Sequence, residues 1–135
     1  MQENHSQQGG IAVKVLRSVE DIEDARPIWE AMQWHPNTDI DFFLTIISVR
    51  KEVLRPHVVI VFDNGKPVAM AVCRIEDIRI ASTIGYKKLF SLPARSLTLL
   101  HGGILGDEQY SKPLVDALFQ AIRQREADVL TLSQV

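Results

Sequence analysis

Residues 57–80 read HVVIVFDNGKPVAMAVCRIEDIRI, and this stretch decides the fold. Two apolar runs of the kind that form buried strands flank the dipeptide Asn64-Gly65. Asparagine and glycine both tolerate the positive φ angles that a two-residue type I′ turn requires. The pattern therefore predicts a β-hairpin in which residues 58–62 pair with residues 68–72. Alternation of apolar and polar residues over 76–80 indicates that the second strand continues.

The segment before this hairpin predicts one strand and two helical stretches. Residues 11–17 alternate in the manner of a half-buried strand. A helix should follow over residues 18–33, with Ser18 and Asp21 resembling a capping box. Pro27 lacks the backbone donor that a helix interior needs, so we expect a kink or two short helices meeting near Arg26. Thr38 or Asp39 should then cap the next helix.

That next helix, residues 39–53, carries apolar side chains on two of its faces. One face holds Ile40, Phe43, Leu44 and Ile47, and the other holds Phe42, Ile46, Val49 and Val53. A helix with two apolar faces has to be covered on both sides. Two explanations fit equally: the helix is sunk in the core of this domain, or a partner outside the domain packs against it.

The segment after the hairpin predicts a loop, a strand, a helix and a last strand. Residues 82–96 contain Gly85 and Pro93, and we expect a solvated loop held by Tyr86 and Phe90, or else a loop that reaches a ligand. Residues 97–101 form a strand, residues 111–127 an amphipathic helix with a proline in its first turn, and residues 128–135 a strand. A strand–helix–strand unit makes its two strands parallel.

The predicted order is β-α-α-β-β-β-α-β, which indicates a mixed α/β (α+β) sheet with helices on its faces. Residues 1–10 read as a flexible polar tail, and residues 11–135 as one domain without an internal linker. The length of 135 residues fits a single domain.

Composition excludes several classes of function. The net charge is −2 with no basic stripe, which argues against nucleic acid and against an anionic membrane surface. The single cysteine, Cys73, cannot form an internal disulfide, and the four histidines show no metal-ligand spacing, so no metal site is predicted. No signal peptide or membrane span is readable, and we expect a cytoplasmic protein.

The ordered set of elements resembles the acetyltransferase fold of the GNAT superfamily. The residues that carry the resemblance are Trp29, the helix DFFLTII, the hairpin HVVIVFDNGKPVAMAVCRIED, the stretch IGYKKLFSLPARSLTLLHGGILGD and the final ADVLTLSQV. The chain looks most like the N-terminal half of tandem-GNAT proteins, which include the FemAB-like group and the cellulose-biosynthesis-associated CelD/BcsL type. The resemblance runs from about residue 13 to the end.

This resemblance implies a role within a larger acyltransferase. In such proteins the C-terminal half holds most of the acyl-CoA site, so the parent protein would use acetyl-CoA or another acyl-CoA. The present chain would be a partial domain whose sheet is incomplete at the C-terminus. It would bind no cofactor and catalyse nothing alone, and would supply part of the substrate cleft while packing against the C-terminal half. A stand-alone α/β interaction module that self-associates, as a dimer, is the alternative.

The segment HGGILGDEQY (residues 101–110) indicates whether the chain can bind coenzyme A. GNAT proteins that bind coenzyme A share a Gln/Arg-x-x-Gly-x-Gly/Ala loop at the turn that this segment resembles. The backbone N–H groups of that loop hold the pyrophosphate. Here Asp107 and Glu108 stand where the anion would lie, and the glycines come earlier. We therefore expect no pyrophosphate binding at this turn.

The glycines inside the strand need another explanation. Adjacent glycines in a strand usually mark a bulge or the close approach of a ligand. A substrate-side role would involve His101, Gly102, Gly103 and Tyr110, which are the candidate binding residues. No catalytic residue is predicted, because the chain has no Gly-x-Ser-x-Gly nucleophile motif and no readable triad. Neither the acceptor substrate nor the acyl group follows from the sequence.

Overall fold

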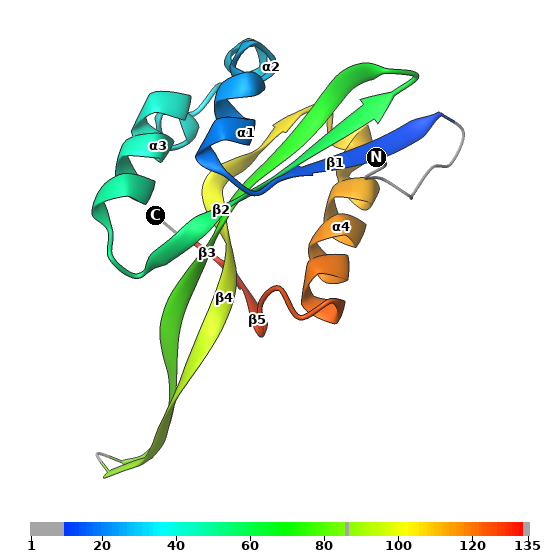
Figure 1. The fold of residues 1–135 in the computed structure, drawn as a ribbon. Helices are drawn as coiled ribbons and strands as arrows, with labels where there is room; N and C mark the ends of the chain where they lie inside the picture. The colour runs from blue at the N-terminus through cyan, green and yellow to red at the C-terminus, as the bar shows by residue number, and fades with distance from the viewer. Residues whose placement is uncertain (1–9, 86, 134–135) are drawn as a thin grey trace.

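A computed structural model describes residues 10–85 and 87–133 of the chain. The elements are β1 (Ile11–Leu16), α1 (Val19–Asp24), α2 (Arg26–Met32), the 3-10 turn η1 (Pro36–Thr38), α3 (Ile40–Val49), β2 (Val53–Asp63), β3 (Lys66–Ile84), β4 (Lys87–Gly106), the 3-10 turn η2 (Glu108–Tyr110), α4 (Ser111–Arg123) and β5 (Val129–Leu132). The described strands form one sheet in the order β1-β2-β3-β4-β5 (Figure 1). All neighbours are antiparallel except β4 and β5, which are parallel as predicted.

The hairpin at the centre of the sheet is confirmed. Asn64 has φ 53° and Gly65 has φ 84°, so both turn residues adopt the left-handed conformation that the dipeptide predicts. Val58 pairs with Val72 and Ile60 with Met70, which is the expected register. The local sequence therefore determines which residues of β2 and β3 face each other.

We expect the substitution Gly65→Val to lower the free energy of unfolding by about 1–2 kcal/mol. A Cβ atom at this position would meet nothing within 4 Å, so the cost comes from forcing a β-branched residue to a φ of 84°. Urea denaturation of both proteins measures the difference. Gly65→Asn is the matched control, because asparagine tolerates positive φ, and it should lose clearly less. Equal stability of the valine variant would contradict the assigned turn.

The N-terminal helices form as their caps predict. Ser18 Oγ accepts the N–H of Asp21 at the start of α1, and Asp39 accepts the N–H of Phe42 at the start of α3. The predicted break before Pro27 is also present, because α1 ends at Asp24 and α2 begins at Arg26. Helices α1 and α3 thus each begin with a side-chain cap, whereas α2 follows α1 without one.

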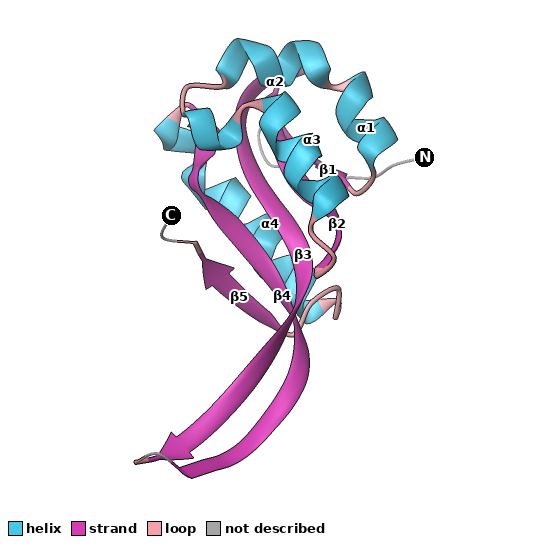
Figure 2. Cartoon of the chain, turned by 90° about the vertical axis from the view of Figure 1, so that its left-hand side faces the viewer, coloured by secondary structure: helices cyan, strands magenta, loops and turns pink. Residues whose placement is uncertain are grey.

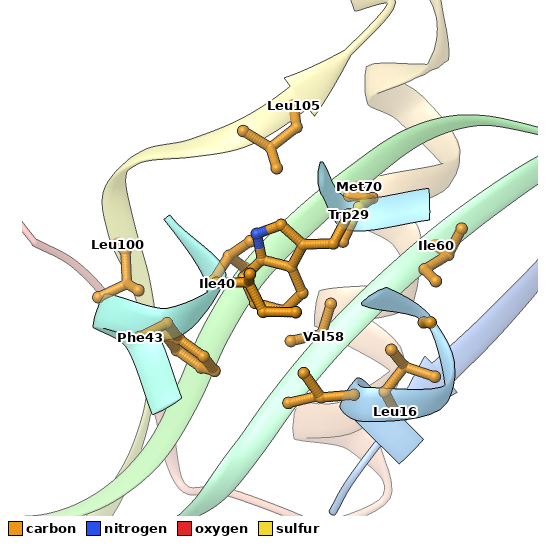
Figure 3. Close-up of a cluster of buried hydrophobic side chains, with 12 residues drawn as sticks. Leu16, Trp29, Ile40, Phe43, Val58, Ile60, Met70, Leu100 and Leu105 are labelled. Carbon is orange, nitrogen blue, oxygen red and sulfur yellow. The ribbon is translucent and has the colours of Figure 1, made fainter. Parts of the chain in front are cut away.

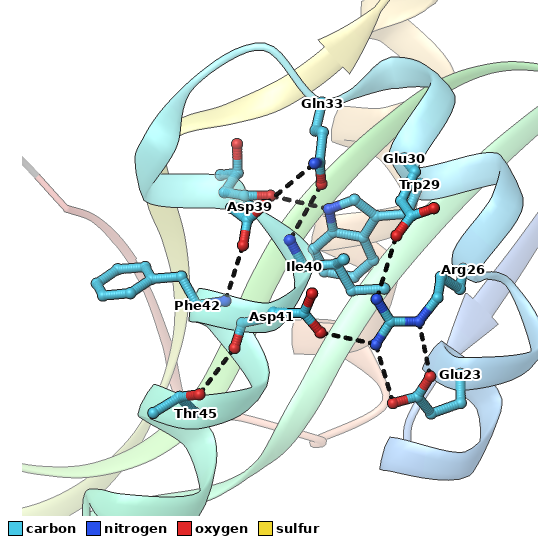
Figure 4. Close-up of polar contacts among 11 residues, drawn as sticks. Glu23, Arg26, Trp29, Glu30, Gln33, Asp39, Ile40, Asp41, Phe42 and Thr45 are labelled. Atoms are coloured by element: carbon cyan, nitrogen blue, oxygen red, sulfur yellow. Dashed lines mark hydrogen bonds and ion pairs between the residues drawn. The ribbon is translucent and has the colours of Figure 1, made fainter.

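Arg26 ties the three N-terminal helices together. Its guanidinium donates to Glu23 of α1 at 2.9 Å, to Glu30 of α2 at 3.2 Å and to Asp41 of α3 at 2.8 Å (Figure 4). Exposed pairs of this kind each contribute little, but a shared arginine restricts the relative orientation of the helices. Arg26 thus links the three helices that cover one face of the sheet.

Two hydrophobic cores lie on opposite faces of the sheet. Helices α1, α2 and α3 cover one face and α4 covers the other, as the side view in Figure 2 shows. Alternate strand residues divide between the two: Val58, Ile60, Met70 and Val72 face the first core, while Val59, Val61, Ala69 and Ala71 face the second. This division explains why β2 and β3 read as continuous apolar runs.

Trp29 lies at the centre of the first core (Figure 3). Its side chain is fully buried, it contacts the ring of Phe43 at a centroid distance of 5.3 Å, and its Nε1 donates to the carbonyl of Thr38 at 2.8 Å. A buried indole N–H needs such an acceptor. Trp29 therefore joins α2, η1 and α3 through a single side chain.

Helix α3 buries only one of its two apolar faces within the described residues. Ile40 and Phe43 are buried against the first core, whereas Phe42 is 46% exposed and Val49 is 65% exposed. Ile46 is half-buried. The second apolar face of α3 is thus exposed to solvent near both ends of the helix and half-buried between them.

The prediction of a solvated loop over residues 82–96 is wrong. Strands β3 and β4 continue beyond the sheet as a two-stranded arm, in which Asp77 pairs with Arg95 and Ile80 pairs with Leu92 (Figures 1 and 2). Cross-strand hydrogen bonds satisfy the backbone that a loop would have exposed to water. Tyr86, one half of the expected aromatic plug, lies outside the described residues.

A cluster of charged side chains surrounds the buried His57 near the end of α4. Arg17 and Arg55 both donate to Glu126, at 2.9 Å and 2.8 Å. His57 is fully buried beside them, with Nδ1 3.3 Å from Arg55 Nη1 and 3.8 Å from Glu126 Oε1, and its Nε2 has no partner among the described residues. Burial, reinforced by the two arginines, lowers the pKa of His57 to about 4, whereas the hydrogen bond from Arg17 lowers the pKa of Glu126 to about 2.

These two groups make the stability depend on pH in different ranges. Because the folded pKa of His57 lies below its ordinary value of 6.5, the unfolded chain takes up this proton first, and the contribution is lost as the pH falls from 6.5 towards 4. The contribution of Glu126 to the stability is lost only as the pH falls from 4.5 to about 2. We expect the His57 term to remove about 2 kcal/mol between pH 7 and pH 5.

The variant His57→Phe isolates this term. Urea denaturation of both proteins at several pH values should show a flatter dependence for the variant above pH 5, whatever its stability at pH 7. An unchanged slope would mean that His57 is protonated in the folded protein at pH 5.

No helix within residues 10–85 and 87–133 combines the length and the apolar character needed to cross a membrane.

Candidate functional site

The glycine pair lies in a bulge of β4. Ala71 pairs with Ile104 and Cys73 with Leu99, so residues 100–103 of β4 stand opposite the single residue Val72. Gly102 adopts φ 74°, and a Cβ atom there would lie 2.6 Å from the ring of His35. A side chain is excluded at this position by both conformation and space. The bulge was one of the two explanations that the sequence offered for these glycines.

The segment between α2 and α3 holds this bulge in place. Asn37 Nδ2 donates to the carbonyl of His101 at 3.0 Å. The hydroxyl of Thr38 lies between two carbonyl oxygens, at 3.1 Å from that of His35 and 3.4 Å from that of Gly102. Trp34 Nε1 donates to the carbonyl of Ile104 at 3.2 Å. The loop that follows Trp29 therefore fixes the backbone of β4 where it departs from the regular ladder.

A groove opens where β4 and β5 part. Strand β5 pairs with residues 96–99 of β4, and the N–H of Ser133 donates to the carbonyl of Leu99 at 2.9 Å. Beyond this point a groove of about 430 Å³ is lined by Trp34, Leu99, Leu100, His101, Gly102, Ile104, Leu132 and Ser133. Its walls are mainly apolar, and two exposed rings, Trp34 and His101, stand at its rim.

Three aromatic rings contact one another beside this groove. The ring of Trp34 contacts His35 edge-on at 5.2 Å, and His35 contacts His101 edge-on at 5.1 Å. His35 Nδ1 accepts the backbone N–H of Asn37 at 3.0 Å, which helps to hold the ring in this position. Of these three rings, Trp34 and His101 line the groove and offer stacking surfaces to a ligand there.

The four candidate binding residues separate in the structure. His101 and Gly102 line the groove, whereas Gly103 is buried in the bulge behind it. Tyr110 is not part of the lining: its hydroxyl donates to Asp63 at 2.6 Å, which raises the pKa of the phenol and joins η2 to the hairpin turn. Trp34 and Leu132 line the groove but were not predicted, since only the folded chain brings them beside β4.

The start of α4 is the position at which a pyrophosphate would have to bind. Asp107 Oδ1 accepts the N–H of Gln109 at 3.1 Å, and the carbonyl of Asp107 accepts the N–H of Tyr110 at 3.1 Å. The N–H of Ser111 donates to the carbonyl of Glu108, and Pro113 has no N–H. Three of the backbone donors at this turn are thus occupied, and a fourth is missing because of the proline.

The charges at this helix start lead to the same conclusion. Asp107 and Glu108 are exposed, and acidic side chains already complement the positive end of the helix dipole. A phosphate group would be repelled by both carboxylates. The residues present therefore do not fit the pyrophosphate of coenzyme A.

Cys73 is not a candidate nucleophile. Its side chain is fully buried in the second core, and burial raises the pKa of the thiol far above the physiological range. Within the described part of the chain, no three His, Cys, Asp or Glu side chains cluster in a way that could hold a metal ion.

Comparisons with known proteins relate the chain to others by fold. No model of a known protein family matches the sequence, and no curated protein matches it. Among solved structures, a GNAT family acetyltransferase from Staphylococcus aureus superposes with a TM-score of 0.50 at 12% identity, covering 93% of this chain and 87% of that one. The chain therefore has a GNAT-like mixed α/β fold.

Two further structures align over most of their length. A ribosomal-protein-alanine N-acetyltransferase from Brucella melitensis biovar Abortus gives a TM-score of 0.48 at 15% identity, covering 91% of this chain and 79% of that one. A transcriptional regulator from Bacillus halodurans gives 0.43 at 9% identity, covering 91% and 82%.

Proposed function

We propose that this chain is a GNAT-like domain that does not hold acyl-CoA by itself and forms the substrate side of a cleft in an N-acyltransferase. The acyl-CoA would be held by a second GNAT-like half of the same enzyme. The GNAT-like fold and the ordered sequence resemblance support this assignment. The chain would position an acceptor substrate without carrying out the chemical step.

The observation that carries the proposal is the state of the turn between β4 and α4. Helix starts bind phosphate groups through free backbone N–H groups and a positive dipole. Here the N–H of Gln109 is bonded to Asp107 and that of Ser111 to Glu108, and both acidic side chains face solvent. In a domain with the acyltransferase fold whose N–H groups at this turn are already bonded, the cleft cannot hold the pyrophosphate of the cofactor.

The groove between β4 and β5 supports a binding role for that cleft. Trp34 and His101 are its exposed rings, and the apolar side chains of Leu99, Leu100 and Leu132 are also part of its lining. Apolar walls with a few polar groups are typical of sites that bind small molecules. We assign acceptor contact to Trp34 and His101, because an exposed indole and an exposed imidazole offer stacking and hydrogen bonding together.

Titration calorimetry with acetyl-CoA tests the cofactor half of this proposal. We expect no saturable heat up to about 1 mM, the upper end of the range in which enzymes usually bind their substrates. The double variant Asp107→Asn, Glu108→Gln is the matched control: it removes both charges but keeps the acceptors, so it should not bind either. Micromolar binding of acetyl-CoA to the unmodified chain would contradict the proposal. Binding gained only by the neutral variant would show that charge alone blocks the site.

A further inference from the structure

We propose that Arg74 is the anion-binding residue of a second small-molecule site, which takes a ligand through a carboxylate group. Arg74 follows Val72, a residue of the first core, by two positions on β3, so it projects from the same side of the sheet. The segment that follows α3 runs beside it, because the N–H of Asp77 donates to the carbonyl of Glu52 at 2.8 Å. This inference is independent of the proposed acyltransferase role.

A row of polar side chains crosses this side of the sheet from β3 to β5. The strand pairing places five of them together: Arg74, Glu76, Ser96, Thr98 and Thr131. Thr131 is exposed, whereas the other four are buried, and Arg74 is only 9% exposed. Buried polar groups nearly always have hydrogen-bond partners, so a buried arginine with unused donors calls for an explanation.

The hydroxyl groups of this row determine how Arg74 binds Glu76. Arg74 Nε donates to Glu76 Oε1 at 3.0 Å, while the other carboxylate oxygen, Oε2, accepts from Thr98 Oγ1 at 2.7 Å. The hydroxyl of Ser96 lies 2.9 Å from that of Thr98 and 2.8 Å from that of Thr131. Glu76 therefore holds the guanidinium of Arg74 by a single hydrogen bond, to Nε.

Two other arginines of the chain bind their carboxylates through two nitrogens. Arg17 donates from Nε and Nη2 to the two oxygens of Glu126, and Arg26 donates in the same way to Glu23. At Arg74 the second oxygen is engaged by a hydroxyl, and Nη1 and Nη2 form no hydrogen bond within the described part of the chain. These two nitrogens, referred to below as the fork, have the planar geometry that a carboxylate matches with two parallel bonds.

Solvent reaches the fork of Arg74. Among the described residues, His57 Nε2 is the only side-chain nitrogen or oxygen that is fully buried without a partner, so neither nitrogen of the fork is closed off. A ligand can therefore approach the fork, although the rest of Arg74 is buried. A charge-assisted hydrogen bond made in such a partly buried place is stronger than the same bond on an open surface.

The charges around Arg74 favour a ligand with a single negative charge. Glu76 balances the charge of Arg74, and the neighbouring pair of Arg50 and Glu52, 2.7 Å apart, is balanced as well. The pKa of Glu52 is lowered first by a backbone hydrogen bond, then by Arg50, and to a smaller extent by the charge of Arg74. A doubly charged phosphate would meet both carboxylates without any excess of positive charge, whereas a carboxylate brings one charge and fits the fork.

The proposed site is separate from the groove between β4 and β5 but lies beside it. Thr98 and Thr131 each stand two positions before a groove residue of the same strand, Leu100 and Ser133 respectively. Two positions correspond to about 7 Å along a strand. Arg74 is not part of the groove lining, so variants of Arg74 test this site without altering the groove.

NMR titration of the ¹⁵N-labelled full chain with propionate tests the proposal. The Arg74 Nε–H signal and the neighbouring amide signals of β3 and β4 should shift saturably, with a dissociation constant of about 1 mM. Propionamide, which has nearly the same shape but no charge, and inorganic phosphate should each bind at least about tenfold more weakly. The proposal would be overturned by the absence of saturable shifts up to about 10 mM propionate, by equal binding of propionamide, or by tighter binding of phosphate.

The variant Arg74→Lys separates the fork from the charge. Lysine keeps a positive charge beside Glu76 but has no planar fork, so propionate should bind at least about tenfold more weakly. Arg50→Lys is the matched control, because it makes the same change in the neighbouring exposed pair and should leave the affinity unchanged. Equal affinities of Arg74→Lys and the unmodified chain would overturn the proposal.

A second variant changes the fork without replacing Arg74. Thr98→Val removes the hydroxyl that engages Glu76 Oε2, so this oxygen becomes available to Nη2, as in the pairs of Arg17 and Arg26. The fork would then be partly occupied, and propionate should bind several-fold more weakly. Circular dichroism checks that each variant is folded. An unchanged affinity in folded Thr98→Val would overturn the assignment of the carboxylate to the fork.

Discussion

Replacing Trp29 by alanine should lower the free energy of unfolding by about 4 kcal/mol. The side chain is fully buried between α2, α3 and the sheet, and the cavity left behind would be lined by Phe43, Ile40 and Met70. The variant would also leave the carbonyl of Thr38 without the indole donor that it accepts at 2.8 Å. Both losses destabilise the folded protein, because water can reach neither the cavity nor the unpaired carbonyl group of Thr38.

Urea denaturation followed by circular dichroism measures this effect. Trp34→Ala is the matched control, because Trp34 is 65% exposed and its removal should change stability by less than about 1 kcal/mol. Trp29→Phe keeps an aromatic ring but removes the donor, and should fall between the two. If both tryptophan-to-alanine variants lost the same stability, the first core would not be organised around Trp29.

The second large effect is expected for Glu76→Ala, at about 3 kcal/mol. Glu76 accepts from Arg74 Nε at 3.0 Å and from Thr98 Oγ1 at 2.7 Å, and all three side chains are buried on one face of the sheet. Removing the carboxylate leaves the guanidinium of Arg74 buried without this partner. The loss therefore reflects a stranded charge more than a missing contact.

A double-mutant cycle separates these two causes. The pair Arg74→Met, Glu76→Leu replaces the ion pair by apolar side chains of similar size, and should be closer in stability to the native chain than Glu76→Ala is. Chemical denaturation of the native chain, the single variants Arg74→Met and Glu76→Leu, and the double variant gives the coupling energy. Additive losses would mean that the two side chains do not depend on each other.

Features set by neighbouring residues could be read from the sequence. The Asn64-Gly65 turn, the caps at Ser18 and Asp39, and the helix break before Pro27 all depend on residues a few positions apart. Each was predicted and each is present. The parallel pairing of β4 and β5 also followed, since a helix between two strands leaves few alternatives.

The arm was missed because a proline and a glycine suggested a loop. Pro93 lies on β4, which is an edge strand along the arm, and an edge strand tolerates a residue without an N–H. Gly85 lies between the two arm strands, where the chain reverses direction. The alternation of Ile78, Ile80 and Leu92 was the signal that could have identified the arm.

The groove could be predicted only in part. Adjacent glycines pointed to a bulge, but the position of that bulge depends on His35 and Asn37, which are more than 60 residues earlier in the chain. Trp34 and Leu132 come together at the groove only in the folded chain. Such sites are set by tertiary contacts, and a single sequence does not encode them in any local pattern.

The sheet order β1-β2-β3-β4-β5 also has a consequence for the rate of folding. Every strand pairs with its neighbour in the chain, so the hairpins can form by closing short loops, and little chain entropy is lost before contacts form. Only β1 and β5 must wait for intervening helices. We expect the β2–β3 hairpin to be structured in the folding transition state, so that Gly65→Val slows refolding more than it speeds unfolding. Stopped-flow kinetics that place the whole effect in the unfolding rate would show that the helical layer, rather than the hairpin, forms first.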